Sequence, residues 1–187
     1  MTLEIYTKEN FFPERLHHKA WHYCVNSKAR WGEYDDIPEE PSGCTINIKT
    51  KEAVFKKFDE TSREAFPVLD GYELVRMYIN VFFPCEYPRW HVDAEKIPGL
   101  EAYTVLYYPH LQWERNAGGC TEFWDDGNGI HGSLPLPNRA VCFEATQWHR
   151  ATTFNKEVRY TFALKYEKCG PDFDFRKYGS PRFGDRD

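Results

Sequence analysis

The chain has 187 residues, a formal net charge of -5, and aromatic residues at 17% of its composition. This length predicts one domain, residues 1–187, that can bury a core without disulfides or a structural metal. The acidic balance argues against a nucleic-acid-binding surface, which needs a basic stripe. No apolar run approaches the length of a membrane span, so neither nucleic acid nor membrane is expected as a partner.

The cysteines and the first residues bear on the compartment. Six cysteines are spread along the chain without a C-x-x-C pair, which argues against a zinc ribbon or a thioredoxin-type site. Residues 1–12 lack a basic segment followed by an apolar run, so no secretory signal is expected. Free thiols favour a reducing, cytoplasmic setting. The sequence carries no signal for an oligomeric state.

The first third of the chain, residues 1–70, is predicted to be mostly helical. Apolar residues recur at helical spacing over residues 13–27 and again over residues 51–66. Between them, residues 31–44 are acidic and contain two prolines, which predicts a loop. The acidic stretch 33–40 could favour a basic substrate, although a solvated loop explains it equally well.

From Tyr72 onward the hydrophobic period changes from 3.6 to 2, which predicts strands. Asp126-Gly127-Asn128-Gly129 predicts a tight turn. The expected strands cover residues 73–83, 90–93, 102–108, 120–124, 140–144, 149–154 and 158–166. Helices followed by short strands predict an α+β fold, with a jelly-roll-like double sheet in residues 72–167, helices packed on one sheet, and a C-terminal tail in residues 168–187.

Three side chains of the strand region form a candidate metal-ligand set. His91 and Asp93 lie two apart on an expected strand, so their side chains point to one face, and His149 begins a later strand. Two imidazoles and one carboxylate hold non-haem Fe(II) while leaving other coordination positions open. The H-x-D motif alone is weak: the alternatives are a partly buried core histidine and a surface turn aspartate.

Arg159, ten residues after His149, is the candidate anion-binding residue. Its guanidinium stays charged and can pair with a carboxylate through two parallel hydrogen bonds. It therefore suits the far carboxylate of a dicarboxylic co-substrate. The alternative is a surface arginine paired with Glu157 or Glu167.

Other polar and aromatic residues near these positions receive weaker assignments. The hydroxyls of Thr104 and Thr161 are candidates for further contacts in the site. Residues 84–89 (PCEYPR) could form part of a substrate lid or a plain connecting loop. Trp90, Trp124 and Trp148 are expected in the core or the pocket wall, His17, His18 and His22 are expected to face solvent, and His110 and His131 are not chosen as ligands.

The ordered set of motifs resembles the Fe(II)/2-oxoglutarate-dependent dioxygenases. In chain order it comprises His91-x-Asp93, Leu106-Tyr107-Tyr108, Trp113, residues 118–123 (GGCTEF), residues 140–143 (AVCF), His149 and Arg159. Within that superfamily the chain is most similar to the prolyl 4-hydroxylase-like group, over roughly residues 72–167. The resemblance implies a double-stranded β-helix, the jelly-roll core that cupins also have.

The resemblance also implies roles for individual residues. His91, Asp93 and His149 would bind the iron, and Arg159 would pair with the distal carboxylate of 2-oxoglutarate. Tyr108 matches a tyrosine that often hydrogen-bonds this carboxylate.

Three positions near the site differ from the family's pattern or depend on the register. Tyr107 replaces Tyr108 as the candidate if the register slips by one residue. Phe83 stands where many relatives have a tyrosine near the co-substrate. Asn155-Lys156 stands where many relatives have a glycine shortly before the basic residue.

The implied activity is hydroxylation of an unactivated C–H bond, with O2 consumed and succinate and CO2 released. Ascorbate is a candidate further cofactor. Asp93 favours hydroxylation over halogenation, because halogenating relatives lack this carboxylate. The substrate could be a peptidyl proline, a free amino acid or another small molecule. Two alternatives stay open: a non-catalytic jelly-roll binding module, and a cupin-like metalloenzyme that does not use 2-oxoglutarate and would not need Arg159.

Overall fold

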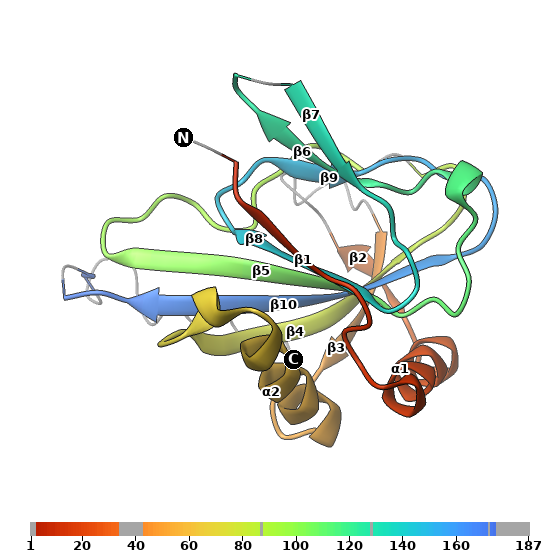
Figure 1. Ribbon diagram of the computed structural model, residues 1–187, viewed down its shortest axis with the longest axis horizontal. Coiled ribbons are helices and arrows are strands. Elements are labelled where there is room, and N and C mark those ends of the chain that lie inside the picture. Colours follow the sequence, from red (N-terminus) through yellow and green to blue (C-terminus); the bar gives the residue numbers. More distant parts are fainter. Residues whose placement is uncertain (1–2, 34–42, 87, 128, 172, 175–187) are drawn as a thin grey trace.

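The computed structural model describes residues 3–33, 43–86, 88–127, 129–171 and 173–174. These residues form two antiparallel sheets, with two helices packed against the larger one (Figure 1). The large sheet contains β1 (Ile5–Lys8), β2 (Arg30–Glu33), β3 (Gly43–Ile48), β4 (Glu73–Phe82), β5 (Leu100–Tyr108), β8 (Arg139–Glu144) and β10 (Arg159–Cys169). The small sheet contains β6 (Thr121–Asp125), β7 (Gly129–Ser133) and β9 (His149–Ala151). This arrangement confirms the expected α+β fold with a double-stranded β-helix core.

The strand order of the large sheet is β1-β8-β5-β10-β4-β3-β2, and that of the small sheet is β7-β6-β9. Strand β10 lies at the centre of the large sheet, paired with β4 on one side and β5 on the other. Its side chains alternate between two faces, as the pleat of a strand requires. Arg159, Thr161, Ala163 and Lys165 face a cavity on the side of the small sheet, whereas Phe162, Leu164 and Tyr166 enter the core beneath the helices.

The helices α1 (Glu14–Asn26) and α2 (Ala53–Ala65) cover the other face of the large sheet (Figure 1). Phe58 of α2 stacks on Phe162 of β10 with ring centroids 4.5 Å apart, and burial of such aromatic side chains contributes about 1.5–3 kcal/mol each. A 3-10 turn, η1 (Pro67–Leu69), follows α2, because Pro67 cannot continue the helix. Both helices lie within two residues of their predicted bounds.

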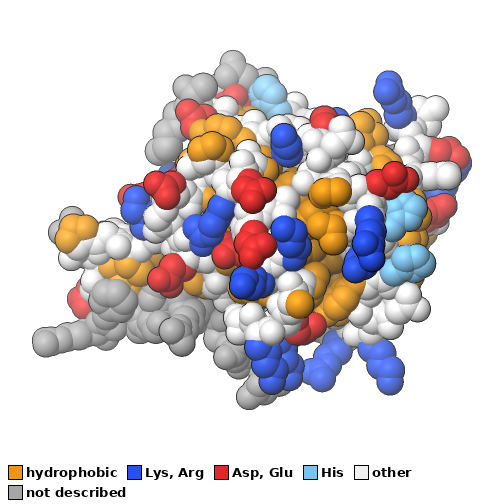
Figure 2. Space-filling view, turned by 60° about the horizontal axis from the view of Figure 1, so that its bottom comes forward, with side chains coloured by type: hydrophobic (Ala, Val, Ile, Leu, Met, Phe, Trp, Pro, Cys, Tyr) orange, Lys and Arg blue, Asp and Glu red, His pale blue; other side chains and the backbone are white. Residues whose placement is uncertain are grey.

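The face that carries α1 and α2 has acidic and basic side chains interspersed among apolar ones (Figure 2). This mixture differs from the continuous basic stripe that nucleic-acid binding requires. Within the described residues, neither helix is long and apolar enough to cross a membrane.

Several strand predictions need correction. Residues 90–93 do not form a strand: His91 makes an isolated bridge with His149, and the chain then turns as the amides of Asp93 and Ala94 both donate to the carbonyl of Ala145. The strand expected over residues 149–154 ends at Ala151.

Four strands, β1, β2, β3 and β7, were not predicted. The ends of the predicted loop, residues 31–44, belong to β2 and β3, and its middle, residues 34–42, lies outside the described residues. The same holds for residues 175–187 of the predicted tail, while residues 168 and 169 still belong to β10. β7 carries two glycines, which lower strand propensity, and β1 is an edge strand that is largely exposed.

Candidate active site

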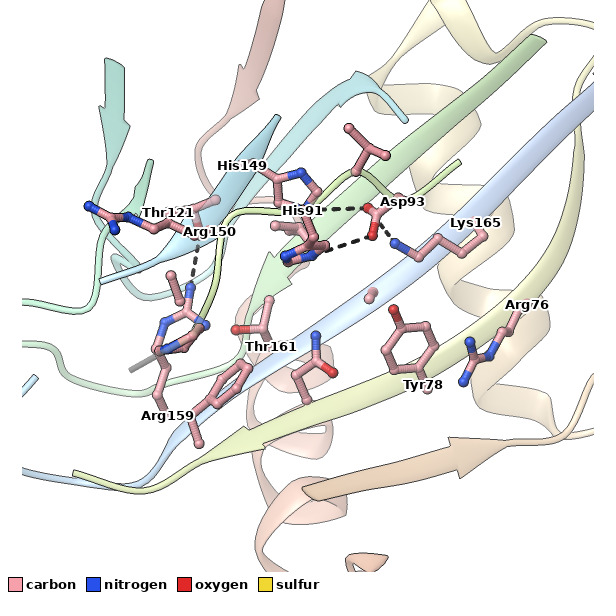
Figure 3. A pocket seen from close by; sticks show the side chains of 17 residues that line it. Arg76, Tyr78, His91, Asp93, Thr121, His149, Arg150, Arg159, Thr161 and Lys165 are labelled. Carbon is pink, nitrogen blue, oxygen red and sulfur yellow. Dashed lines mark hydrogen bonds and ion pairs between the residues drawn. The ribbon is translucent and has the colours of Figure 1, made fainter. Parts of the chain in front are cut away.

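A cavity lies between the two sheets (Figure 3). Its floor is made by alternate side chains of β4, from Arg76 to Phe82, and of β10, from Arg159 to Lys165. Thr121 of β6, the three residues of β9 and residues 91–93 form the opposite wall. The four residues selected from the sequence as metal and anion ligands therefore line one cavity.

The side chains of His91, Asp93 and His149 come together at this cavity. One ligand atom from each lies within 4.8 Å of the others. The Nε2 atom of His91 is 3.8 Å from Oδ1 of Asp93, and Nε2 of His149 is 3.5 Å from Oδ2 of the same carboxylate. Three such donors converging on one point can hold a divalent metal on one face.

Hydrogen bonds to the backbone orient both imidazoles. Nδ1 of His91 is 3.0 Å from the carbonyl oxygen of Arg89, and Nδ1 of His149 is 2.9 Å from that of Gln147. In the tautomer that these carbonyls favour, Nδ1 donates its proton and Nε2 keeps a free lone pair. Both Nε2 atoms face the Asp93 carboxylate, so the tautomers suit metal binding.

The local backbone fixes the separation of the two histidines. The amide of His91 donates to the carbonyl of His149 at 3.0 Å, and the amide of His149 donates back to His91 at 2.9 Å. This reciprocal pair places the rings with centroids 4.4 Å apart. The predicted strand over residues 90–93 is thus wrong, but the single bridge is enough to place His91 and Asp93 at the same site.

The Asp93 carboxylate is held by a cation and a hydroxyl. It forms an ion pair with Lys165 and accepts a hydrogen bond of 2.6 Å from the hydroxyl of Thr104. Burial acts to raise the pKa of Asp93, but Lys165 and the two histidines outweigh it and hold this pKa below its usual range. The carboxylate is therefore ionised at neutral pH.

The imidazole of His149 is neutral at neutral pH because of its burial. Its side chain is buried, and burial lowers the pKa of His149 to about 4 although Asp93 acts to raise it. At neutral pH its Nε2 lone pair is available to a metal ion without loss of a proton.

Arg159 lies inside the molecule, with 2% of its surface exposed. Its Nε donates to the carbonyl of Gly119 at 3.0 Å, and its Nη2 donates to the hydroxyl of Thr121 at 2.9 Å. Among the described residues no carboxylate forms an ion pair with it, so the alternative partners Glu157 and Glu167 do not neutralise it. A buried guanidinium without a counter-ion is costly, and it fits a ligand that brings a carboxylate.

The turn that receives Arg159 requires glycine. Gly118 and Gly119 have φ of 81° and 76°, a region that L side chains rarely adopt. A Cβ on Gly118 would lie 2.5 Å from the carbonyl oxygen of Thr153, and one on Gly119 would lie 2.8 Å from the Trp113 ring. The predicted Gly-Gly turn thus lets the backbone approach closely and place the Gly119 carbonyl on Arg159.

The neighbours Tyr107 and Tyr108 point to opposite faces of β5. The hydroxyl of Tyr108 donates to Thr121 at 2.8 Å, and its ring lies 5.6 Å from the Arg159 guanidinium carbon. The hydroxyl of Tyr107 lies 2.7 Å from Nδ1 of His17, in the core beneath the helices. The structure therefore brings Tyr108, and not Tyr107, to Arg159.

Of the other residues that the sequence placed near the site, some line the cavity and others lie outside it. Thr161 lines the cavity, whereas Phe83 is 45% exposed just beyond β4, and the β4 tyrosine that lines the cavity is Tyr78. Of the segment 84–89, Pro88 lines the cavity and residue 87 lies outside the described residues.

Two groups of predictions on aromatic rings were wrong in part. His17 is buried and not solvent-facing. Trp124 and Trp148 are largely exposed, because Trp124 occupies the outer face of β6 while Phe123 occupies the inner one. Trp90 is half-buried, with the Arg150 guanidinium 4.5 Å above its ring.

The basic residues Arg76, Arg150 and Lys165 line the cavity but were not among the predicted site residues. A signal existed for one of them: counting in steps of two from Arg159 along β10 reaches Lys165 on the same face. Arg76 lies directly opposite Lys165 on β4, a register that the sequence does not supply.

The strand-rich part of the chain matches a known protein family. A family model described as the 2OG-Fe(II) oxygenase superfamily matches residues 72–166, while no curated protein sequence matches the chain.

Similar solved structures include a prolyl-4-hydroxylase from Pseudomonas putida, with a TM-score of 0.70 and 13% identity over 90% of this chain and 95% of that one. A prolyl hydroxylase from Trichoplax adhaerens, in complex with a hypoxia inducible factor peptide fragment, has a TM-score of 0.66 and 15% identity over 88% and 84%. HygX from Streptomyces hygroscopicus, with nickel and 2-oxoglutarate bound, has a TM-score of 0.68 and 11% identity over 92% and 84%. At such identities the likeness concerns the fold.

Proposed function

The chain belongs to the 2OG-Fe(II) oxygenase superfamily, and from this premise we propose that it hydroxylates an unactivated C–H bond of a small molecule or peptide. His91, Asp93 and His149 would hold the Fe(II), and Arg159 would bind the distal carboxylate of 2-oxoglutarate. When bound, the metal and 2-oxoglutarate supply the oxidation, in which O2 is consumed and succinate and CO2 are released. Ascorbate is a candidate reductant that keeps such a metal in its ferrous state.

The observation that carries this proposal is that the cavity of the triad also holds a buried cation, Arg159, which no carboxylate of the described residues neutralises. The triad alone would suit several divalent metals. Arg159 adds a second requirement, a carboxylate partner, which neither a plain binding module nor a cupin-like enzyme without 2-oxoglutarate needs. Thr121 supports the arginine, because its hydroxyl accepts from both Arg159 and Tyr108.

The chain's own residues would then bind and orient the partners. The two histidines present Nε2 lone pairs, and the ionised Asp93 contributes charge to the metal site. The Arg159 guanidinium, fixed by Gly119 and Thr121, presents its remaining N–H groups to a carboxylate. The two sheets surround this arrangement and limit the access of water, which strengthens each charged contact.

Residues 84–89 have a place in this proposal through Pro88, which lies at the cavity and would contact part of the substrate. Because all six cysteines, each in the described part of the chain, are free thiols, a reducing compartment suits the protein.

Thermal stabilisation tests the proposal. Mn(II) together with N-oxalylglycine, a non-reacting 2-oxoglutarate mimic, should raise Tm by mass action, and more than Mn(II) alone. The matched activity measurement is Fe(II)-dependent release of succinate from 2-oxoglutarate. A protein stabilised by Mn(II) but indifferent to N-oxalylglycine would instead be a metalloprotein of the cupin-like kind, and one indifferent to both would be a binding module.

A further inference from the structure

We propose that Lys165 and Thr104 are positioning residues of the metal site. They hold Oδ2 of Asp93, so that the carboxylate presents Oδ1 alone to the iron, and the Lys165 ammonium makes this site favour Fe(II) over Fe(III). The inference rests on the proposed function, because it concerns the same metal. It goes beyond that function, which assigns no role to either residue.

The two oxygens of the Asp93 carboxylate have different surroundings. Oδ2 accepts a hydrogen bond of 2.6 Å from the hydroxyl of Thr104 and forms the ion pair with the Lys165 ammonium. Nε2 of His149, 3.5 Å from Oδ2, carries no proton in the tautomer described above and is not a third donor. Oδ1 is the oxygen 3.8 Å from Nε2 of His91. Because two donors occupy the lone pairs of Oδ2, Oδ1 is the better metal ligand.

The register of the large sheet brings the two donors together. Lys165 of β10 is directly opposite Thr104 of β5, and its Nζ donates to the Thr104 hydroxyl at 3.3 Å. Nζ, this hydroxyl and Oδ2 of Asp93 therefore form a closed triangle of polar contacts, and Figure 3 shows the Lys165 side chain pointing toward Asp93. Thr104 is fully buried and Lys165 is 7% exposed, so water competes little with these contacts.

The turn that carries Asp93 is fixed to the same strand as Thr104. The amide of Asp93 donates to the carbonyl of Ala145 at 2.8 Å, and the amide of Ala145 donates to the carbonyl of Ala102 at 2.9 Å. Ala102 precedes Thr104 by two residues on β5, so both side chains point to one face. The buried side chains of Ala94, Ala102 and Ala145 pack together, and their small size lets the turn lie close to β5.

The carboxylate is held by side chains, whereas the two histidines are held by the backbone. Nδ1 of His91 and Nδ1 of His149 each lie within 3.0 Å of a carbonyl oxygen. A backbone carbonyl is present whatever residue supplies it. Asp93 is therefore the ligand whose electron donation depends on the residue types at positions 104 and 165.

The charge of Lys165 determines how strongly Asp93 donates to the metal. A cation on Oδ2 draws electron density from the carboxylate and repels a metal ion, and this repulsion is larger for Fe(III) than for Fe(II). Burial strengthens the effect, because the effective dielectric constant is lower than in water. Hydrogen bonds to ligand atoms and burial both tune the reduction potentials of iron sites. The site therefore favours the ferrous state, which the proposed function requires.

The test is an anaerobic redox titration of the full chain loaded with one equivalent of iron, followed through the EPR signal of Fe(III). The midpoint potential reports the ratio of Fe(III) affinity to Fe(II) affinity. Lys165→Met should raise this ratio at least about tenfold, which lowers the midpoint potential by about 59 mV for one electron. Lys165→Arg keeps the cation and should change the ratio less than about threefold.

A second pair of variants tests Oδ2 while leaving the ion pair in place. Thr104→Val removes one neutral hydrogen bond and should raise the same affinity ratio about threefold, and Thr104→Ser should restore it. The matched controls are Lys168→Met, at an exposed lysine on β10, and Thr7→Val, at an exposed threonine on β1. Both controls should leave the midpoint potential unchanged.

The outcomes separate the two proposals. A native protein that Mn(II) and N-oxalylglycine fail to stabilise would overturn the proposed function and this inference together. A native protein that is stabilised, but whose midpoint potential is unchanged in Lys165→Met, would overturn this inference alone. Equal shifts in Lys165→Met and Lys165→Arg would also overturn it, because packing and not charge would be responsible. If Lys165→Met does not fold, Thr104→Val decides, and an unchanged potential in that variant contradicts the inference.

Discussion

Arg159 and Thr121 are joined by a hydrogen bond of 2.9 Å, from guanidinium Nη2 to hydroxyl Oγ1. The same oxygen accepts the hydroxyl of Tyr108 at 2.8 Å. One buried threonine on the small sheet therefore aligns an arginine and a tyrosine from two strands of the large sheet. The arrangement fixes the guanidinium, and within the described part of the chain no carboxylate pairs with it; the consequences can be measured.

Replacing Arg159 by Ala should weaken N-oxalylglycine by at least about 30-fold, because truncating one partner of a buried charge pair costs about 2–5 kcal/mol. Mn(II) affinity should change by less than about threefold, since Arg159 does not contact the triad. Isothermal titration of each ligand checks both values, with Arg30→Ala as the control. Equal losses of metal and mimic would indicate that Arg159 has a structural role.

The two neighbouring tyrosines provide an internal comparison. Tyr108→Phe removes a hydroxyl beside Arg159 and should weaken N-oxalylglycine by about threefold to tenfold, since one hydrogen bond contributes about 0.5–1.5 kcal/mol. Tyr107→Phe removes the contact with His17 and should lower the free energy of unfolding by about 1 kcal/mol without changing N-oxalylglycine affinity. Urea unfolding and titration of the two variants check this, and a reversed pattern would assign the co-substrate to the helix side of β5.

The comparison of Tyr107 with Tyr108 also shows what the sequence could predict. Strand alternation dictates that the two side chains point to opposite faces of β5. Which of these faces lies on the side of Arg159 depends on how β5 pairs with β10. The convergence of His91, Asp93 and His149 was predictable because metal chemistry requires those residue types. The place of Arg159 in the same cavity was predictable from its spacing after His149.

Other features of the fold could not be predicted from the sequence, for a physical reason. Strand β1 pairs with β8 through contacts such as Ile5 with Phe143, and pairings so distant in sequence leave no local pattern. The Arg76–Lys165 pair likewise arises from the register between β4 and β10. The expected burial of Trp148 failed because a large aromatic side chain at the edge of a small sheet can remain exposed.

The Asp93–Lys165 ion pair predicts a coupled effect on stability and metal binding. Asp93→Asn should abolish stabilisation by Mn(II) and lower the free energy of unfolding by about 3–5 kcal/mol, because the buried Lys165 ammonium loses its ion pair with the Asp93 carboxylate. Adding Lys165→Met to Asp93→Asn should restore most of that stability, while Mn(II) binding stays lost. Urea unfolding with and without Mn(II) checks both parts. If the double variant were as unstable as the single one, the ion pair would not be the source of the loss.

Glu167, a buried carboxylate of β10, predicts how stability depends on pH. Its carboxylate is buried and has no hydrogen-bond partner among the described residues, and burial raises the pKa of Glu167 to about 7. A carboxyl group whose folded-state pKa is raised favours the folded state at low pH, and this contribution is lost as pH rises from about 4.5 through about 7.

Glu167→Gln removes the ionisable group at this position. We therefore expect the free energy of unfolding of this variant, relative to the native protein, to increase by about 1–3 kcal/mol between about pH 5.5 and about pH 8.5. Urea unfolding at the two pH values measures it. Glu144→Gln, at the exposed C-terminal end of β8, should show no such change. A pH-independent difference for Glu167→Gln would mean that Glu167 is already ionised in the folded protein at the lower pH.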